Sequence, residues 1–304
     1  MVNPFESGGD WLRCALHAHT TNSDGELAPE LLARHYARAG FDVLAITDHH
    51  VRTVVDSTDA ILVIPSTELD ADVAEDRDAH VLGLGVEADP EPRGQVHRDL
   101  PGTVAWIREG GGLPFLAHTH WSGLRTTDFA ACDGLAGLEV YNGGCALEVG
   151  QGLATLHWDE ALAGGRGLLA IASDDCHHPG FDSAVGWVWA RCAERTREAV
   201  LAALAGGAFY SSAGPRILAL RLADGAVEVE TTPARRITLV AGPRLGSSVS
   251  AGRLGYAARG EVLAQTAEGE IEAARLVRPL AAPFGRIEVE DAAGRLAWTN
   301  PLWN

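Results

Sequence analysis

Apolar runs of strand length alternate with helical segments along the first two thirds of the chain. The strand-like runs are residues 12–19, 42–50, 60–70, 80–86, 113–120, 137–142, 168–178 and 185–192. Apolar positions with helical spacing lie at residues 28–40, 102–112, 153–165 and 196–207. Strands that are apolar along their whole length are covered on both faces, so this alternation predicts an α/β fold with a mainly parallel sheet.

The pattern changes after residue 213. From there to the end, short segments of alternating apolar and polar residues are separated by turn residues, and helical spacing is absent. This pattern is typical of short antiparallel strands. We therefore predict two domains, an α/β domain over residues 1–213 and a small antiparallel β-sandwich over residues 214–304.

The chain is strongly acidic and has no lysine. Its 304 residues have a formal net charge of −17, and all 24 basic residues are arginine. This charge disfavours non-specific binding to nucleic acid or to anionic membranes, because both depend on attraction between basic side chains and phosphates. The absence of lysine excludes Schiff-base and P-loop lysine chemistry. We expect a small-molecule substrate, with no nucleic-acid and no membrane partner.

The cysteines and the N-terminal segment indicate the cellular compartment. Five cysteines are scattered without C-x-x-C spacing, which favours reduced thiols. The first residues show no basic segment followed by an apolar one, and no apolar run approaches the length of a bilayer span. We predict a cytoplasmic protein; the pattern does not indicate its oligomeric state.

Side chains that bind metal ions follow the ends of several predicted strands. His17 and His19 are two residues apart, so on a strand they point to the same face, and Asp24 follows on the next loop. The other candidates are His49, Glu68, His80, His118, Asp175 and His177. In a (β/α) barrel or an open doubly wound sheet, such strand ends meet at one edge. Imidazole and carboxylate ligands suit Zn, Fe and Mn, and this set is too large for one ion.

Together these residues resemble the PHP (polymerase and histidinol phosphatase) family of metal-dependent hydrolases. The motifs are H-x-H followed by Asp, T-D-H, a Glu after the third strand, a single His, an "AH" strand end and a final D-x-H, between residues 17 and 177. The resemblance implies a distorted seven-stranded (β/α) TIM-like barrel around two or three divalent ions, Mn, Fe or Zn. The stretches "GLEVYNG" and "FYSSAGP" and the trailing β domain resemble the carbaryl-hydrolase-like branch of the family.

The PHP resemblance also implies how the nine ligands divide among a trinuclear metal site. By position in the motifs, the first ion is held by His17, His19, Glu68 and Asp175. The second ion is held by Glu68, His80 and His118, with Glu68 as the bridge. The third ion is held by Asp24, His49 and His177.

Two departures from the family pattern bear on the substrate. Thr119, followed by His120, stands where the family usually has Pro, and His50 stands where the narrower branch often has Asn. Both positions are expected at the mouth of the pocket. The other candidate substrate residues are Arg52 and Arg125, which could hold a phosphate or carboxylate, and Tyr141 and Asn142 at a strand end. Glu139 lies at the same strand end. For all three residues, contact with a metal ligand or the substrate is the favoured interpretation, and plain strand-end polarity is the alternative.

A metal site of this kind predicts hydrolysis by a metal-bound hydroxide, because paired cations lower the pKa of a bound water and hold the substrate's oxygens. No side-chain nucleophile is then needed. The acid that protonates the leaving group would be His120, His178 or a metal-bound water. Asp48 either orients a ligand imidazole or caps a turn.

Three functions fit these observations. The first is a metal-dependent phosphoesterase acting on a small phosphorylated metabolite. The second is a hydrolase of carbamate, ester or amide bonds that uses the same ions. The third is a non-catalytic metal-bound module whose β domain binds a partner, and the presence of all nine ligand positions disfavours it. A nuclease role is disfavoured by the acidic charge and the absence of lysine.

Overall fold

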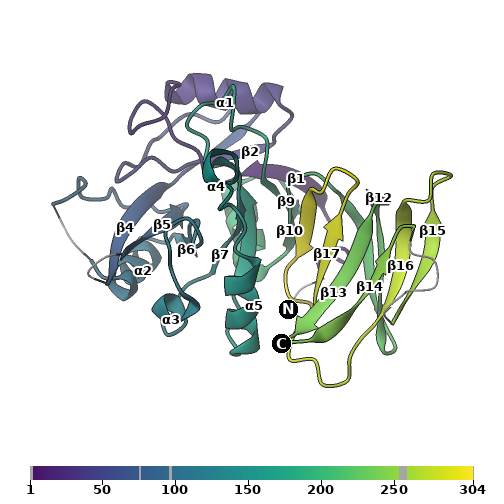
Figure 1. The fold of residues 1–304 in the computed structure, drawn as a ribbon. Coiled ribbons are helices and arrows are strands. Elements are labelled where there is room, and N and C mark those ends of the chain that lie inside the picture. The colour runs from purple at the N-terminus through teal and green to yellow at the C-terminus, as the bar shows by residue number, and fades with distance from the viewer. Residues whose placement is uncertain (1–2, 75–76, 96–97, 253–258, 304) are drawn as a thin grey trace.

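The computed structural model describes residues 3–74, 77–95, 98–252 and 259–303 (Figure 1). In these ranges the chain forms three sheets and a small number of short helices. The helices are α1 (Pro29–Arg38), α2 (Leu100–Glu109), α3 (Thr126–Phe129), α4 (Gly143–Val149), α5 (Thr155–Ala163) and α6 (Arg197–Gly206). The fold is thus a mixed α/β one, as the sequence pattern predicts.

Two of the sheets build the part of the molecule that carries the strand-end histidines. The first is nine-stranded, in the order β14 (Leu245–Ser250), β13 (Arg236–Gly242), β17 (Arg286–Glu290), β18 (Leu296–Thr299), β10 (Phe209–Ser212), β9 (Trp187–Cys192), β1 (Asp10–Ala15), β2 (Val43–Ile46) and β3 (Leu62–Pro65). The second is five-stranded, in the order β4 (Thr67–Ala74), β5 (Arg77–Leu84), β6 (Leu113–Leu116), β7 (Gly137–Asn142) and β8 (Leu169–Ser173).

The expectation of a mainly parallel sheet is wrong. Neighbours within β1–β2–β3 and within β6–β7–β8 are parallel, but β4–β5, β5–β6, β1–β9 and β9–β10 are antiparallel. β4 ends at Ala74 and β5 begins at Arg77, and so short a connection permits only antiparallel pairing. The closed seven-stranded barrel is not confirmed, since the strands of the described residues divide between two sheets.

The two sheets nevertheless enclose one apolar core. Leu16, Phe115 and Ile171, from or beside β1, β6 and β8, pack in the same buried cluster with residues of α6. The opposite faces of β4 to β8 pack against α2 and α5 in a second cluster that includes Val104 and Trp158. Burial on both faces explains why these strands are apolar along their whole length.

The C-terminal part consists of two antiparallel layers. The third sheet has the order β11 (Ile217–Ala223), β12 (Ala226–Ala234), β16 (Ile271–Val277) and β15 (Gly260–Gln265). Its inner residues share one buried cluster with those of β13, β14 and β17, for example Val227 with Ile237 and Val289. Figure 1 shows these two layers, in green and yellow, beside the α/β part.

The predicted boundary at residue 213 does not interrupt the sheet. β18 pairs with β10, so the nine-stranded sheet runs from the α/β part into the sandwich. Across the junction, Arg286 of β17 donates two hydrogen bonds to Asp159 of α5, at 2.7 and 2.9 Å. Trp298 packs in the same cluster as the α5 residue Trp158. The two-domain division remains a prediction. The two parts share one sheet, and residues of both pack in the same buried cluster.

No helix among the described residues is long and apolar enough to cross a bilayer. All five cysteines are buried with free thiols.

Candidate metal centre

Six chain segments bring the predicted ligands to one rim of the α/β part. His17 and His19 follow β1, His49 follows β2, and His118 follows β6. Asp175 and His177 follow β8, and Glu68 is the second residue of β4. Single backbone bridges, Ala18 to Cys176 and His49 to Glu68, join the segments above the ends of the ladders.

His80 reaches the same rim because β5 runs in the opposite direction. β5 is antiparallel to β4 and β6, so His80 lies two residues along from the partner of Glu68, and its carbonyl oxygen accepts from the amide of Ala117, next to His118. Asp70 is the cross-strand partner of His80. A predicted ligand in the middle of a strand thus joins predicted ligands that follow the ends of other strands.

Four ligand atoms converge at the centre of the site. His17 Nε2 lies 3.1 Å from His19 Nε2, 3.1 Å from Glu68 Oε2 and 3.1 Å from Asp175 Oδ1. His19 Nε2 lies 3.2 Å from Glu68 Oε2 and 3.3 Å from Asp175 Oδ1. A tetrahedral site with bonds of about 2.0 Å has ligand atoms about 3.3 Å apart, so the spacing fits an ion such as zinc.

The protons of both imidazoles are held on the side away from this centre. A carboxylate only accepts hydrogen bonds, so His17 donates from Nδ1 to Glu139, at 2.8 Å. Ser23 donates its hydroxyl proton to Asp48 at 2.7 Å, and therefore accepts from His19 Nδ1 at 3.3 Å. With Nδ1 protonated on each ring, loss of the proton from Nε2 would leave both Nε2 lone pairs directed at the centre, where a cation could replace those protons.

The charges of the site favour added positive charge. Burial works against protonation of His17, but the carboxylates of Asp175, Glu68 and Glu139 outweigh it and raise the pKa of His17 well above its usual value. Burial likewise opposes protonation of His19, and Asp175 and Glu68 raise its pKa to about 9. Protons and metal ions compete for such nitrogens, so metal binding here would release protons.

Glu68 faces two groups of histidines with its two oxygens. Oε2 approaches His17 and His19, while Oε1 lies 3.0 Å from His80 Nδ1 and 3.2 Å from His118 Nε2. Its side chain is only 1% exposed. His49 Nδ1 lies 3.4 Å from Oε2, so His49, Glu68 and His80 form another group of possible ligands.

The third group surrounds Asp24 nearer the surface. Asp24 Oδ1 lies 3.4 Å from His177 Nε2 and 3.6 Å from His19 Nδ1, and Oδ2 lies 3.7 Å from His49 Nε2. All nine predicted ligands therefore lie in three adjoining groups. Which residues hold which ion stays a prediction.

Two buried atoms of the predicted ligands make no hydrogen bond, which tests whether ions fit. Within the described residues, Asp175 Oδ1 and His49 Nδ1 are buried without a hydrogen bond. Burial lowers the pKa of His49 to about 4, despite the nearby Glu68 and Asp24, so its ring is neutral and has a free lone pair. Unpaired buried polar atoms are costly. A cation held among His17, His19, Glu68 and Asp175 would pair Asp175 Oδ1, and one held beside His49, Glu68 and His80 would pair His49 Nδ1.

Three residues of the site have left-handed backbone. His50 has φ of 52°, His118 of 24° and Asp175 of 55°. Such conformations cost on the order of 1–3 kcal/mol in a non-glycine residue and persist where the surroundings impose them. α4 begins beside Asp175, where a side chain at Gly144 would come within 3.1 Å of the Asp175 carbonyl oxygen.

A cavity of about 330 Å³ opens onto these groups. The predicted ligands that line it are Asp24, His49, Glu68, His80, His118, Asp175 and His177. Its other lining residues are Arg93, Trp121, Gly144, Cys145, Glu148 and His178. This size suits a small ligand or one part of a larger one.

The predicted substrate arginines are not at the cavity. Arg52 pairs with Asp89 at 2.8 Å, and Arg125 is exposed at the beginning of α3. Neither lines the cavity, and Arg93 does. Asp89 sets the direction of Arg52, and the strand pattern does not reveal this loop partner.

The other substrate predictions need similar corrections. Tyr141 stacks on Trp298, with ring centroids 6.0 Å apart, and lines a different cavity. Asn142 is buried and donates to Glu139 and to Oδ2 of Asp175, a predicted ligand, so it contacts that side chain and no open part of the cavity. His50 accepts from the backbone of Asp70 at 3.2 Å, beside the cavity and outside its lining.

The catalytic predictions divide between two outcomes. His178 lines the cavity mouth, but His120 faces the carbonyl oxygen of Leu153, at 3.2 Å, and lies outside it. Within residues 3–74, 77–95, 98–252 and 259–303, Asp48 forms no ion pair or hydrogen bond with an imidazole. It accepts from Thr20, Ser23 and Thr53, and through Ser23 it fixes the loop that carries His19.

Glu139 is the functional candidate that the sequence analysis left undecided. It is fully buried and accepts from His17 Nδ1, the His118 backbone amide, Asn142 and Ser173. Leu138 and Val140 pack toward the helices, so Glu139 between them points inward. The polar residue between two apolar ones is therefore a sequence signal that could have identified Glu139 as an inward-facing residue. Cys145 also lines the cavity, but burial and neighbouring carboxylates raise the pKa of its thiol, which disfavours a nucleophilic role.

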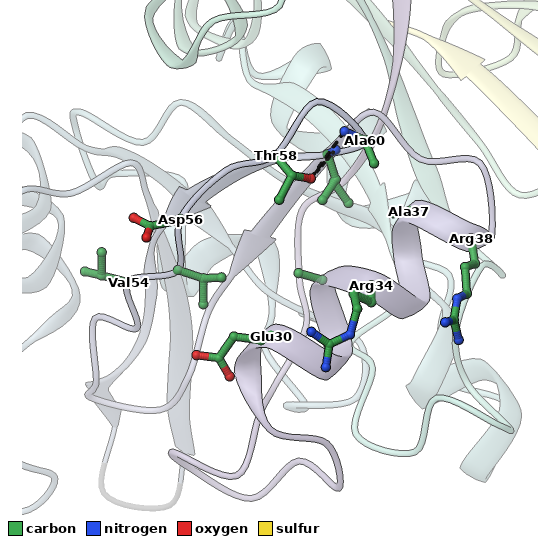
Figure 2. A pocket seen from close by; sticks show the side chains of 11 residues that line it. Glu30, Arg34, Ala37, Arg38, Val54, Asp56, Thr58 and Ala60 are labelled. Carbon is green, nitrogen blue, oxygen red and sulfur yellow. Dashed lines mark hydrogen bonds between the residues drawn. The ribbon is translucent and has the colours of Figure 1, made fainter.

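A second cavity lies away from the metal centre. It measures about 510 Å³ and lies between α1 and residues 54–61 (Figure 2). Figure 2 shows Glu30, Arg34 and Arg38 projecting from α1 opposite Val54 and Asp56. No histidine lines it, so it contributes nothing to the metal centre.

Comparisons with known proteins support the fold. The chain superposes, over 97% of its length and 96% of the other, on a two-domain protein from Bacteroides vulgatus that contains a predicted PHP-like metal-dependent phosphoesterase, with a TM-score of 0.53 and 15% identity. A lower TM-score, 0.41, relates 56% of the chain to 89% of an amidohydrolase from Chromobacterium violaceum, with 18% identity.

Sequence comparison gives a short match. The chain is 34% identical over 80 residues to the 5'-3' exoribonuclease Rnm of Salmonella typhimurium, and 35% identical over 80 residues to that of Escherichia coli. It spans about a quarter of the length of these curated relatives, 27% in each case. No family model matches the chain. The carbaryl-hydrolase-like resemblance finds no support in these matches. The chain has the overall fold of a two-domain PHP-like protein.

Proposed function

We propose that the protein is a multi-metal-dependent phosphoesterase acting on a small phosphorylated metabolite. The observation that carries the proposal is the position of Glu68, whose two oxygens face two histidine groups at 3.0–3.4 Å. A carboxylate in this position suits a bridge between two ions. Mixed imidazole and carboxylate donors suit Zn, Mn or Fe.

His17, His19, Glu68 and Asp175 would hold the first ion, and Glu68, His80 and His118 the second. Asp24, His49 and His177 would hold a third. Ions at these positions would supply positive charge for the phosphate and activate water for attack on phosphorus. The cavity needs that charge, because four carboxylates line it, those of Asp24, Glu68, Glu148 and Asp175.

The residues of the chain orient the ligands and supply a proton. Glu139 holds the His17 ring by accepting from Nδ1 at 2.8 Å, and Asn142 holds Asp175 by donating to Oδ2 at 3.1 Å. Both contacts leave the opposite ligand atom free for an ion. His178, at the mouth with 63% of its side chain exposed, is the proposed acid for the leaving group.

The test is a hydrolysis screen on protein stripped of metal and reloaded with Zn, Mn or Fe. The substrates are 4-nitrophenyl phosphate, bis(4-nitrophenyl) phosphate, 4-nitrophenyl acetate and an aryl N-methylcarbamate. We expect metal-dependent turnover of the phosphate esters. Turnover of the carbamate or acetate alone would establish the alternative metal-dependent carbamate, ester or amide hydrolase. Absence of bound metal and unchanged stability in chelator would refute both.

A second candidate comes from the short match to 5'-3' exoribonucleases, which raises cleavage of RNA. Trp121, 43% exposed and lining the cavity, is a surface on which a base could stack. The net charge of −17 disfavours a long nucleic-acid track. A short 5'-phosphorylated oligoribonucleotide, added to the same screen, separates the two, because a metabolite phosphatase would leave its internal bonds intact.

A further inference from the structure

Arg93 occupies a distinctive place at the rim of the metal cavity. Of the described residues that line the cavity, it alone carries a permanent positive charge. Its side chain is 54% exposed, so it is open to solvent and to an arriving ligand. The remaining charged groups of the lining are carboxylates and histidines that the proposed function assigns largely to metal binding.

The guanidinium of Arg93 is held in a fixed orientation. Nε donates to Asp70 Oδ2 at 2.7 Å, and Nη2 donates to Asp70 Oδ1 at 3.1 Å. This side-on pair uses two of the five N–H donors of the guanidinium. Three donors remain for another anion, in a plane that Asp70 has already set.

Asp70 connects Arg93 to the metal centre. Its Oδ1 lies 3.4 Å from His80 Nε2, while His80 Nδ1 faces Glu68 at 3.0 Å. Arg93 is thus one aspartate and one histidine away from the bridging carboxylate. An anion bound at Arg93 would lie near the metal ions without coordinating them.

His50 fixes both segments that meet at this point. Its Nε2 accepts from the backbone amide of Asp70 at 3.2 Å, so its ring proton is on Nδ1 and is donated to the carbonyl oxygen of Glu91 at 3.3 Å. Glu91 is two residues before Arg93, and its carboxylate accepts from Arg98 at 2.9 Å. His50 has φ of 52°, which directs its ring between the two segments.

We infer that Arg93, oriented by Asp70 and positioned through His50, is an anion-recognition residue that selects substrates bearing a second negatively charged group. This inference rests on the proposed function, in which the ions bind the phosphate. The substrate class is therefore a phosphate ester with a carboxylate or a second phosphate on its alcohol part. His50 is a positioning residue in this arrangement.

The experiment measures binding to the metal-loaded full chain without turnover. The probes are phenylphosphonate and its 3-carboxy and 4-carboxy derivatives, titrated by calorimetry. We expect wild-type protein to bind at least one carboxylated probe about tenfold more tightly than phenylphosphonate, as one partly exposed charge-assisted contact allows. Arg93→Gln should remove this preference and leave the affinity for phenylphosphonate unchanged.

Arg52→Gln is the control, because Arg52 also pairs with an aspartate, by one hydrogen bond from Nε to Asp89, and lies outside the cavity lining. It should retain the preference. His50→Asn tolerates the left-handed backbone but has a shorter side chain, so it should reduce the preference without changing the affinity for phenylphosphonate.

The outcomes separate this inference from the proposed function. No preference in wild-type protein, or a preference that survives Arg93→Gln, overturns the role of Arg93. An Arg93-dependent preference supports it, even if no phosphate ester is hydrolysed in the separate screen. Absence of phosphate-ester hydrolysis would refute the phosphoesterase proposal, and the Arg93-dependent preference would still support the anion site.

Discussion

Glu139→Gln is the perturbation that tests the metal centre most directly without removing a ligand. Glu139 accepts from four donors, the His17 ring at 2.8 Å, the His118 amide at 2.8 Å, Asn142 at 2.9 Å and the Ser173 hydroxyl. Glutamine keeps one acceptor oxygen and adds an NH₂ group, so at least one donor would face another donor. The His17 ring would lose the charged partner that directs Nε2 toward the ion.

The expected loss of metal affinity is about 10- to 100-fold, as for other groups that orient ligand imidazoles. This corresponds to about 1.4–2.7 kcal/mol of binding free energy. The metal-free fold should also lose about 2–3 kcal/mol of unfolding free energy, because a buried charge-assisted acceptor disappears. Competition with a colorimetric chelator measures the first quantity, and urea unfolding in chelator measures the second.

The control is Asp291→Asn in the sandwich. Asp291 is also buried and accepts from the backbone of Ala293 and from Arg295, at 2.8–2.9 Å, far along the chain from the metal centre. It should lower the unfolding free energy and leave metal affinity unchanged. If Glu139→Gln keeps its metal affinity within twofold of wild type, the reasoning about ring orientation is refuted.

Three further changes address the bridge, the acid and the junction. Glu68→Gln should lose more than one ion per chain and about 100-fold or more in 4-nitrophenyl phosphate turnover; full metal content with a normal rate would contradict the bridge. His178→Gln should slow phenyl phosphate hydrolysis by about 100-fold and leave 4-nitrophenyl phosphate nearly unaffected, because only the poorer leaving group needs an acid. Equal effects on both substrates would contradict that role. Arg286→Met, which leaves Asp159 without its buried partner, should cost about 3 kcal/mol in urea unfolding. A loss below about 1 kcal/mol would show that the junction depends little on this pair.

The sequence alone was enough to identify the predicted metal ligands and to place most of them at the ends of strands. His17, His19, His49 and Asp175 follow apolar runs that form strands, and the hydrophobic pattern is enough to place them at strand ends. The pattern is local, since burial of a strand on both faces is visible in its own residues. The change of pattern after residue 213 likewise anticipated antiparallel strands.

Only the tertiary structure decided which side chains face the cavity. His80 lies in the middle of its strand and reaches the rim because β5 is antiparallel to both of its neighbours. Arg52 and Arg125 point elsewhere, while Arg93 turns inward because Asp70 of β4 holds it. These outcomes depend on pairing between segments distant in sequence. The pattern along one segment cannot contain them, because a side chain's direction in a loop is set by partners that only folding brings near.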